Sequence, residues 1–399
     1  GFTASAMLRT REFVAMMAIL FATLAFSIDA MLPALPEIAR ELSPDAVNRA
    51  QLIILSFVLG MGIGTIFTGP LSDAFGRKPI ITAGIALFVL GAGLAFFAPT
   101  LEFILLARFI QGLGAASPRI VPMAMMRDLY EGRRMAQITS FVMTVFMLVP
   151  AVAPYLGALI IELAGWRYIF VAFILFSLVG WSWLTIRQPE TLLPADRRPL
   201  NFTKLKEAAR EVVSNRPVMI FTAVLALGFT QMIALISSTQ QVYDVTFDQG
   251  ASFPMWFALS ALLAATGTIL NARLVMHVGM RKLALISYAL QTVFAFCYVL
   301  AMWMGIIPAS LAFALWFIWS VSIFFMAGLT FGNLNALALQ SLGHIAGMAA
   351  SIIAAISTIA SVFLAIPIGL SFDGTPMPLL IGAVVCSFLA FLLMRSTTD

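Results

Sequence analysis

Charged side chains are scarce in this chain: they make up 10% of its 399 residues, while 61% of the residues are hydrophobic. A soluble domain has about a quarter charged residues and about half apolar ones. So much apolar surface cannot be hidden from water by folding alone, so the surrounding solvent must be lipid. The composition excludes a cytosolic enzyme and a secreted module. The spread of apolar residues from end to end also argues against a single membrane anchor.

Histidine and cysteine are also rare, and this excludes several kinds of site. His277 and His344 are the only histidines, which leaves no imidazole cluster for a metal ion and no basis for an intramembrane enzyme. Cys297 and Cys386 each lie in an apolar run, so we expect two small buried side chains and no disulfide framework. No glycine-rich phosphate loop occurs, so ATP is not the expected energy source. The sequence predicts neither a metal nor a cofactor, and no enzymatic activity.

Twelve apolar runs are long enough to cross a membrane as helices, which takes roughly 20 residues each. They cover residues 13–32, 50–70, 80–98, 102–123, 137–161, 168–187, 217–240, 254–275, 283–303, 308–331, 347–370 and 377–394. The first run is too long for a signal peptide, and no small-residue cleavage site follows it, so we expect a span there. The sequence therefore predicts an all-α membrane protein with twelve transmembrane helices.

A polar, proline-containing gap near the middle of the chain separates two groups of six spans. Such a division is typical of transporters built from structural repeats. The predicted organisation is an N-terminal six-helix half at 1–187, a cytoplasmic linker at 188–216 and a C-terminal six-helix half at 217–399. Within the linker, residues 204–213 are expected to form a short amphipathic helix.

The two halves also match each other locally. Leu71 and Gly76 follow the second predicted span. Leu274 and Gly279 follow the eighth span at the same offset of 203 residues, and a basic pair ends both segments. The shared position in each half indicates an internal repeat.

Basic residues are distributed unevenly between the gaps. With the N-terminus inside, only Arg40, Arg49 and Arg167, of 23 lysines and arginines, fall on the outer side. Cytoplasmic loops of membrane proteins carry such an excess of basic residues. Both termini are therefore predicted to be cytoplasmic, and the net charge of +5 reflects topology rather than nucleic-acid binding.

Three charged residues lie well inside predicted spans, where each costs roughly 2.5–3.5 kcal/mol. They are Asp29, Arg108 and Arg119. Asp29 and Arg108 lie roughly 6 and 9 Å from the outer ends of their helices, so a direct or water-bridged pair is expected. Burial and a neighbouring cation act in opposite directions on the pKa of a carboxyl group. Such a group can bind and release protons as its access to water changes. The alternative is a purely structural pair that locks the first half together.

Arg119 follows Arg108 by eleven residues, which places both on one helix face about 16 Å apart. Two interpretations stay open for Arg119: snorkelling toward the inner surface, or contact with an anionic or carbonyl-rich cargo. Gln231, Gln240 and Asn333 in later spans are further candidates for substrate binding. Such polar residues more often form hydrogen bonds between packed helices.

Several motifs resemble those of one transporter family. Residues 69–79 (Gly-Pro-Leu-Ser-Asp-Ala-Phe-Gly-Arg-Lys-Pro) look like the signature loop of the major facilitator superfamily, and residues 105–116 resemble its fourth-helix motif. Together with residues 29–36, 127–130 and 332–339, they resemble the Bcr/CflA branch of drug/proton antiporters.

A further stretch resembles a degenerate form of the fifth-helix motif of proton-driven exporters. It covers residues 149–157 and contains Pro150, Pro154 and Gly157. Ala153 stands where the motif usually has glycine. The resemblance to this motif implies a proton-driven exporter.

The resemblance to the superfamily implies two six-helix halves around a central cavity, with export of amphipathic organic molecules or drugs in exchange for protons by alternating access. It supports Asp29, with Arg108, as the proton-coupling site. It also implies a conformational latch formed by Gly69, Asp73, Gly76, Arg77 and Asp128. Asp73 is expected near the start of the eleventh helix, and Arg77 is expected to pair with Asp128. The expected partners are a small amphipathic molecule, protons and membrane lipid, for a monomer in the bacterial inner membrane.

The identity of the cargo stays open. A proton-coupled importer or exporter of a specific anionic metabolite is the main alternative, because Arg119 favours an anion. A non-transporting membrane sensor is an alternative of another class. Substrate-dependent proton flux would separate a transporter from such a sensor.

Overall fold

The computed structural model describes residues 8–398, and all regular secondary structure in that range is helical. Twelve helical stretches are long and apolar enough to cross a membrane, which confirms the predicted spans. Two of them, Thr10–Leu42 and Gly132–Ala164, each contain two successive α-helices. The chain is thus a multi-pass α-helical membrane protein.

The helices follow the predicted spans in order. The first six spans are α1 (Thr10–Asp29) with α2 (Leu35–Leu42), α3 (Leu52–Phe75), α4 (Arg77–Phe96), α5 (Leu101–Leu129), α6 (Gly132–Phe146) with α7 (Leu148–Ala164), and α8 (Tyr168–Arg187). The amphipathic helix predicted at 204–213 is α9 (Phe202–Ser214). The last six spans are α10 (Arg216–Gln241), α11 (Phe253–Val278), α12 (Met280–Met304), α13 (Ala309–Leu339), α14 (Ala346–Leu370) and α15 (Met377–Arg395).

Proline and capping residues account for several helix ends. Pro33 has no backbone N–H to donate to the carbonyl of Asp29, four residues earlier, and α1 ends at Asp29. Thr100 caps the start of α5, where its hydroxyl accepts a hydrogen bond from the Phe103 N–H at 3.2 Å. Pro118 and Pro122 lie inside α5 without ending it, as membrane helices tolerate proline where neighbouring groups satisfy the freed carbonyls.

The residues group into two compact units. The first unit contains the chain up to Ser43 together with Ser56–Leu205, and the second contains Pro44–Leu55 and the chain from Lys206 onward. These units differ from the predicted halves in two places. The linker is divided after Leu205, and the short segment before the second span belongs to the second unit.

A chain of polar side chains explains why the segment Pro44–Leu55 belongs to the second unit. The Gln51 amide donates to the Gln241 carbonyl oxygen at 2.7 Å, and the Gln241 amide donates to Asn48 at 2.7 Å. Asn48 in turn donates to the backbone carbonyl of Phe372 at 2.8 Å. Side-chain amides therefore fasten this segment to α10 and to the chain after α14.

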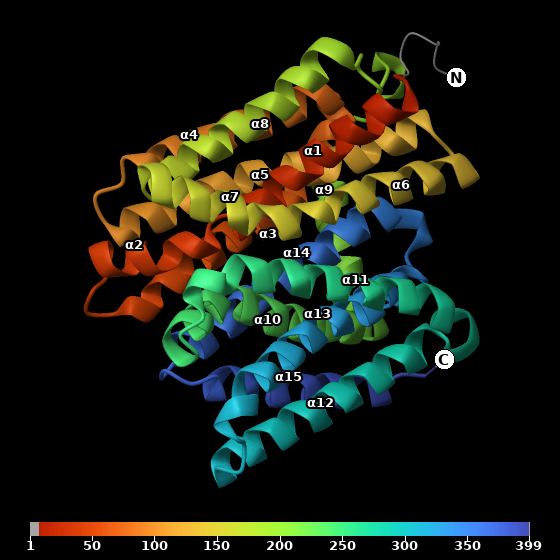
Figure 1. The fold of residues 1–399 in the computed structure, drawn as a ribbon. Helices are drawn as coiled ribbons and strands as arrows, with labels where there is room; N and C mark the ends of the chain where they lie inside the picture. The colour runs from red at the N-terminus through yellow and green to blue at the C-terminus, as the bar shows by residue number, and fades with distance from the viewer. Residues whose placement is uncertain (1–7, 399) are drawn as a thin grey trace. The chain divides into compact units, whose positions relative to one another are not determined.

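Close backbone contact between α4 and α5 organises the first unit. A Cβ atom at Gly114 of α5 would overlap the backbone carbonyl of Gly84 on α4, so small residues permit the approach. In Figure 1, α4 also runs beside α8, in agreement with the packing between these two helices. One end of this unit is filled by a buried apolar cluster that includes Phe13, Ile81 and Met125.

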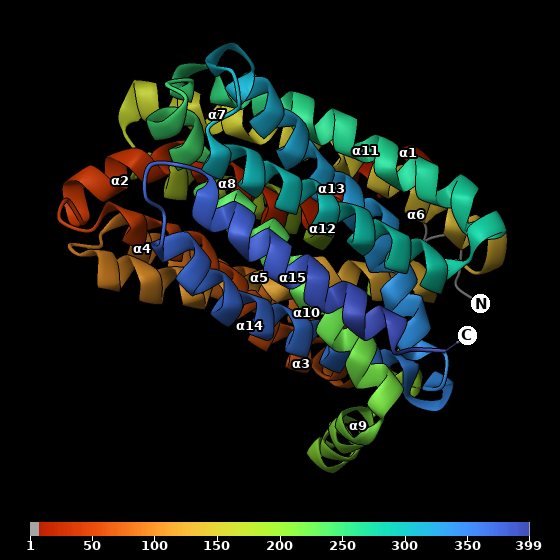
Figure 2. The same ribbon diagram turned by 90° about the horizontal axis from the view of Figure 1, so that it is seen from below.

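The second unit is organised around α10 and α15. Helix α15 packs against both α12 and α10, and α10 also packs against α14 (Figure 2). Trp316 and Trp319 of α13 are fully buried, and the Trp316 ring lies 6.5 Å from the Tyr243 ring in an edge-to-face arrangement. Aromatic packing therefore fills one end of this unit.

Candidate functional site

Asp29 is the last residue of α1, and its side chain is buried in the first unit. Only 7% of its surface is exposed. Among the described residues 8–398, no hydrogen-bond or ion-pair partner of its carboxyl group is present. A buried carboxylate without a partner is costly, and a bound proton removes that cost. The position therefore suits a group that gains and loses a proton.

Arg108 on α5 is fully buried close to the same end of α1. It donates to the Ser27 backbone carbonyl at 3.0 Å and to the Gln111 side-chain oxygen at 3.0 Å. Its guanidinium group also lies 4.3 Å from the centre of the Phe57 ring. A cation that binds a terminal carbonyl stabilises the carboxyl end of a helix.

The direct ion pair predicted between Asp29 and Arg108 is not present within the described part of the chain. The physical reason is an unpaired backbone carbonyl at the end of α1. The N–H of Met31 bonds to Ile28 in a tighter turn, so the Ser27 carbonyl needs another donor, and Arg108 supplies it. A water-bridged contact to Asp29 stays a prediction.

The fifth-helix motif contacts α1 next to Asp29. Pro154 and Gly157 are buried on α7, and a Cβ atom at Gly157 would overlap the backbone carbonyl oxygen of Ala30. Glycine at this position lets the two backbones touch. Pro150 belongs to the same helix and is partly buried. The motif therefore packs against the backbone of Ala30, the residue that follows Asp29.

Replacing Gly157 with alanine is expected to lower the melting temperature of the purified protein by several degrees. The added methyl group must push α7 away from a rigid backbone, and such overpacking costs about 1–3 kcal/mol. Gly93→Ala is the matched control, because a Cβ atom at Gly93 of α4 has no heavy atom within 4 Å. Equal thermal stability of the two variants would contradict the close packing of α7 on Ala30.

Arg119 reaches α3 from the same face of α5 as Arg108. Its Nη1 atom donates to the Met61 sulfur at 2.7 Å, and Met61 lies one helical turn after Phe57, the residue that Arg108 contacts. No carboxylate of the described first unit lies within ion-pair distance of Arg119. A thioether is a weak acceptor, so the positive charge is left without a counter-charge in that unit.

Gln111 is a member of this polar face that the sequence analysis missed. It is fully buried three residues after Arg108, and its Nε2 atom has no hydrogen-bond partner within residues 8–398. The signal was present, since residues three apart share a helix face. Arg108, Gln111 and Arg119 therefore form a polar stripe along α5.

The three candidate residues of the later spans differ in their surroundings. Gln231 accepts a hydrogen bond from Ser387 at 2.9 Å, which links α10 to α15. Asn333 donates to Asn271 at 2.8 Å, which links α13 to α11. The Oε1 atom of Gln240 is buried without a partner among the described residues. Two of the three thus form packing contacts between helices, and Gln240 has an acceptor still available for a ligand.

The predicted latch residues meet where α3 turns into α4. Arg77 forms the predicted pair with Asp128 through two bonds of 2.9 and 3.1 Å, and it also donates to Asp73 at 2.6 Å. Gly76 adopts a φ of 101°, which glycine tolerates, and Gly69 accepts a bond from Ser72 at 3.0 Å. The contact predicted between Asp73 and the start of the eleventh span stays a prediction.

The linker joins this cluster, which the sequence analysis did not foresee. The Glu190 carboxylate accepts a hydrogen bond from the backbone N–H of Lys78 at 3.0 Å, at the start of α4. Thr191 donates to Asp128 at 2.8 Å, and the Arg198 N–H donates to the Asp73 carbonyl at 2.9 Å. A carboxylate near a helix N-terminus is favourable, so the linker caps α4.

The metal-binding and cysteine predictions can be compared with the described residues. Within residues 8–398, no group of three or more His, Cys, Asp or Glu side chains could hold a metal ion. Both cysteines are free; Cys386 is buried, but Cys297 is exposed on α12. The prediction of two buried cysteines was therefore wrong for Cys297, because an apolar run in a membrane helix also supplies the outward-facing surface.

Comparisons with known proteins relate this chain to membrane transporters. A family profile described as Major Facilitator Superfamily matches residues 16–365. The chain is 29% identical over 383 residues to a protein named bicyclomycin resistance protein homolog from Haemophilus influenzae, with 93% of each chain covered. It is 27% identical to multidrug resistance protein MdtL of Shewanella oneidensis, with 70% of each chain covered.

Solved structures share the fold. A crystal structure of a D-xylose-proton symporter matches with a TM-score of 0.74 at 17% identity, covering 97% of this chain and 98% of the symporter. Such low identity supports the architecture alone.

Proposed function

Because the chain belongs to the Major Facilitator Superfamily, we propose that it is a proton-coupled antiporter that exports amphipathic organic molecules by alternating access. The observation that carries this proposal is the buried carboxyl group of Asp29, which has no partner among the described residues. The next residue, Ala30, is the one whose backbone meets Gly157 of α7. The names of the relatives, which refer to bicyclomycin and multidrug resistance, support export of foreign compounds.

In the proposed cycle Asp29 binds a proton that enters from outside and releases it to the inside. Protonation removes a buried negative charge, which lowers the cost of enclosing the site in an apolar environment. Arg108 positions the end of α1 through the Ser27 carbonyl, so the carboxyl group stays at the same depth in both protonation states. Cargo is carried outward while Asp29 is deprotonated, and the proton is carried inward while the cargo site is empty.

The proposal places the protein as a monomer in the bacterial inner membrane, with both termini in the cytoplasm. The excess of basic residues in alternate gaps supports this orientation. Accordingly, the cluster around Arg77 lies on the cytoplasmic side. We infer that this cluster, formed by Gly69, Asp73, Gly76, Arg77 and Asp128, acts as the conformational latch.

Replacing Asp73 with asparagine is expected to shift the population toward the inward-open state and to slow turnover, with cargo affinity changed little. Asp73 supplies one of the two carboxylates bound to Arg77, while Asp128 keeps that side chain in place. A latch acts on the equilibrium between states and not on the binding pocket. Cysteine accessibility measured from both sides of the membrane checks this, and unchanged accessibility would remove Asp73 from the latch.

A second candidate function is transport of a specific anionic metabolite, in either direction, coupled to protons. Arg119 favours it, because this partly buried guanidinium group contacts a thioether and has no carboxylate partner in its unit. Gln111, on the same helix as Arg119, would add a hydrogen bond to such a cargo. A non-transporting membrane sensor is the third alternative.

Proton flux in proteoliposomes tests the proposal. The purified protein is reconstituted with an internal pH-sensitive dye, and cationic, neutral and anionic candidates are added, with bicyclomycin among them. Proton movement opposite to cargo movement is the expected result. Movement in the same direction would replace antiport by symport, and cargo binding without any flux would favour a sensor.

A further inference from the structure

Helix α9, which lies outside the twelve spans, has two different apolar faces. Ala208 and Val212, one helical turn apart, are buried, with 3% and 0% of their surfaces exposed. Phe202 and Val213 lie on another face and are 59% and 57% exposed. Apolar surface left in water is unfavourable. The second face is therefore suited to contact with another apolar phase.

Two basic residues lie between the exposed apolar residues on this second face. Phe202, Lys206, Arg210 and Val213 follow one another at steps of four, four and three residues. This spacing places side chains on one side of an α-helix. Lys206 and Arg210 are exposed as well. These four residues, the α9 strip, combine apolar and basic side chains as helices that lie at a membrane surface do.

A contact on a different face fixes the rotation of α9. The Glu211 carboxylate and the Nε2 atom of His344 are joined by a hydrogen bond of 2.5 Å. His344 lies in the short turn between α13 and α14. Because Glu211 is about 100° further around the helix than Arg210, this bond holds the acidic side chain against the protein and leaves the α9 strip exposed.

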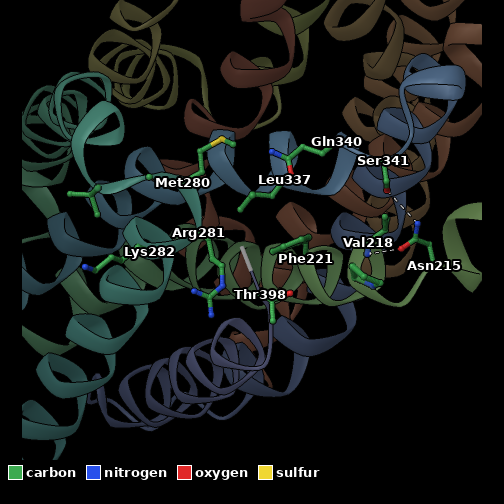
Figure 3. A pocket seen from close by; sticks show the side chains of 13 residues that line it. Asn215, Val218, Phe221, Met280, Arg281, Lys282, Leu337, Gln340, Ser341 and Thr398 are labelled. Carbon is green, nitrogen blue, oxygen red and sulfur yellow. Dashed lines mark hydrogen bonds between the residues drawn. The ribbon is translucent and has the colours of Figure 1, made fainter.

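The end of α9 lies at the level where the next helix enters the membrane. Asn215 alone separates Ser214, the last residue of α9, from Arg216, the first residue of α10. Figure 3 shows Asn215 accepting a hydrogen bond from the Val218 N–H at 3.2 Å and donating to Ser341 at 3.4 Å. In Figure 2, α9 lies at a steep angle to α10 instead of continuing its line. The α9 strip is therefore held close to the level of the lipid headgroups.

We propose that the α9 strip binds the surface of a membrane that contains anionic phospholipid. Phe202 and Val213 enter the boundary between headgroups and acyl chains, and Lys206 and Arg210 contact the headgroup phosphates. Two observations favour lipid over a soluble protein partner: α9 adjoins a membrane-spanning helix, and the basic residues of the strip are opposite in charge to anionic headgroups. This site does not depend on the proposed transport function.

Spin labels on the full chain test the proposal. Val213→Cys and Lys204→Cys, each with both native cysteines replaced by alanine, carry a nitroxide in nanodiscs of phosphatidylcholine with or without phosphatidylglycerol. Lys204 is exposed on the side of α9 opposite to the strip. With phosphatidylglycerol, the label at position 213 is expected to collide mainly with oxygen, which concentrates in lipid. The label at position 204 is expected to collide mainly with a water-soluble nickel chelate.

Two results of this experiment would contradict the proposal. Equal exposure of both labels to the nickel chelate would overturn it and assign the α9 strip to a soluble partner. An equal preference for oxygen at position 213 in phosphatidylcholine alone would overturn the role of the anionic headgroups.

Charge substitutions locate the binding within α9. Lys206→Gln and Arg210→Gln are each expected to lower the ratio of lipid-shielded to water-exposed label at position 213 about fivefold, the effect of one basic residue near an anionic surface. Lys204→Gln is the matched control and should change this ratio little. Equal reductions in Lys204→Gln and Lys206→Gln would show attraction to net charge alone and overturn the proposal. Unchanged melting temperatures are expected, because all three side chains are exposed.

Discussion

Asp29→Asn is expected to yield a folded, membrane-inserted protein in which a proton gradient no longer drives cargo against its concentration gradient. Asparagine has nearly the shape of aspartate, and the native side chain has no described ion-pair partner for the substitution to break. The amide cannot bind and release a proton, so coupling is lost while the packing around this side chain is kept. Uphill transport in proteoliposomes should fall to the level of protein-free liposomes.

Downhill exchange of labelled cargo separates lost coupling from lost folding, and we expect Asp29→Asn to retain it. Asp29→Glu should recover part of the uphill activity, since the longer acid still titrates. Asp45→Asn is the matched control, because Asp45 is exposed just after the first span. If the Asp29→Asn variant still concentrates cargo under a pH gradient, the proton carrier lies elsewhere.

Arg119→Ala is expected to weaken binding of anionic or carbonyl-rich cargo more than tenfold, or about 1.4 kcal/mol, and to spare or improve cationic cargo. The guanidinium group has only the Met61 thioether as a hydrogen-bond partner in the described first unit. An anionic cargo would relieve that charge, whereas a snorkelling arginine would gain nothing from it. Binding constants for cargo pairs of opposite charge measure the difference.

Arg119→Lys should recover only part of the loss, because lysine lacks the planar fork of arginine. Arg127→Ala is the control on the same helix, since Arg127 is exposed near the end of α5. Losses of equal size for both cargo charges would assign Arg119 a structural role. The generic drug-exporter interpretation would then hold without an anion preference.

Hydropathy alone predicted the number and order of the spans, because bilayer thickness sets the length of a membrane helix. The amphipathic pattern of 204–213 likewise predicted α9. Asp29 was identifiable because a charge in an apolar run has a high cost. Glycines and prolines in recognisable motifs located the turn before α4 and the contact region of α7.

The sequence by itself determined which segments lie in the membrane and which charges lie inside them. Only the tertiary structure decided what those charges touch. Arg108 binds the Ser27 carbonyl instead of the Asp29 carboxylate, and Glu190 caps α4 from the distant linker. Spans and buried charges follow from local composition, because the free energy of moving a segment from water into the bilayer depends on the residues of that segment. Partners depend on the rotation and register of packed helices, which arise from contacts between residues far apart in the chain.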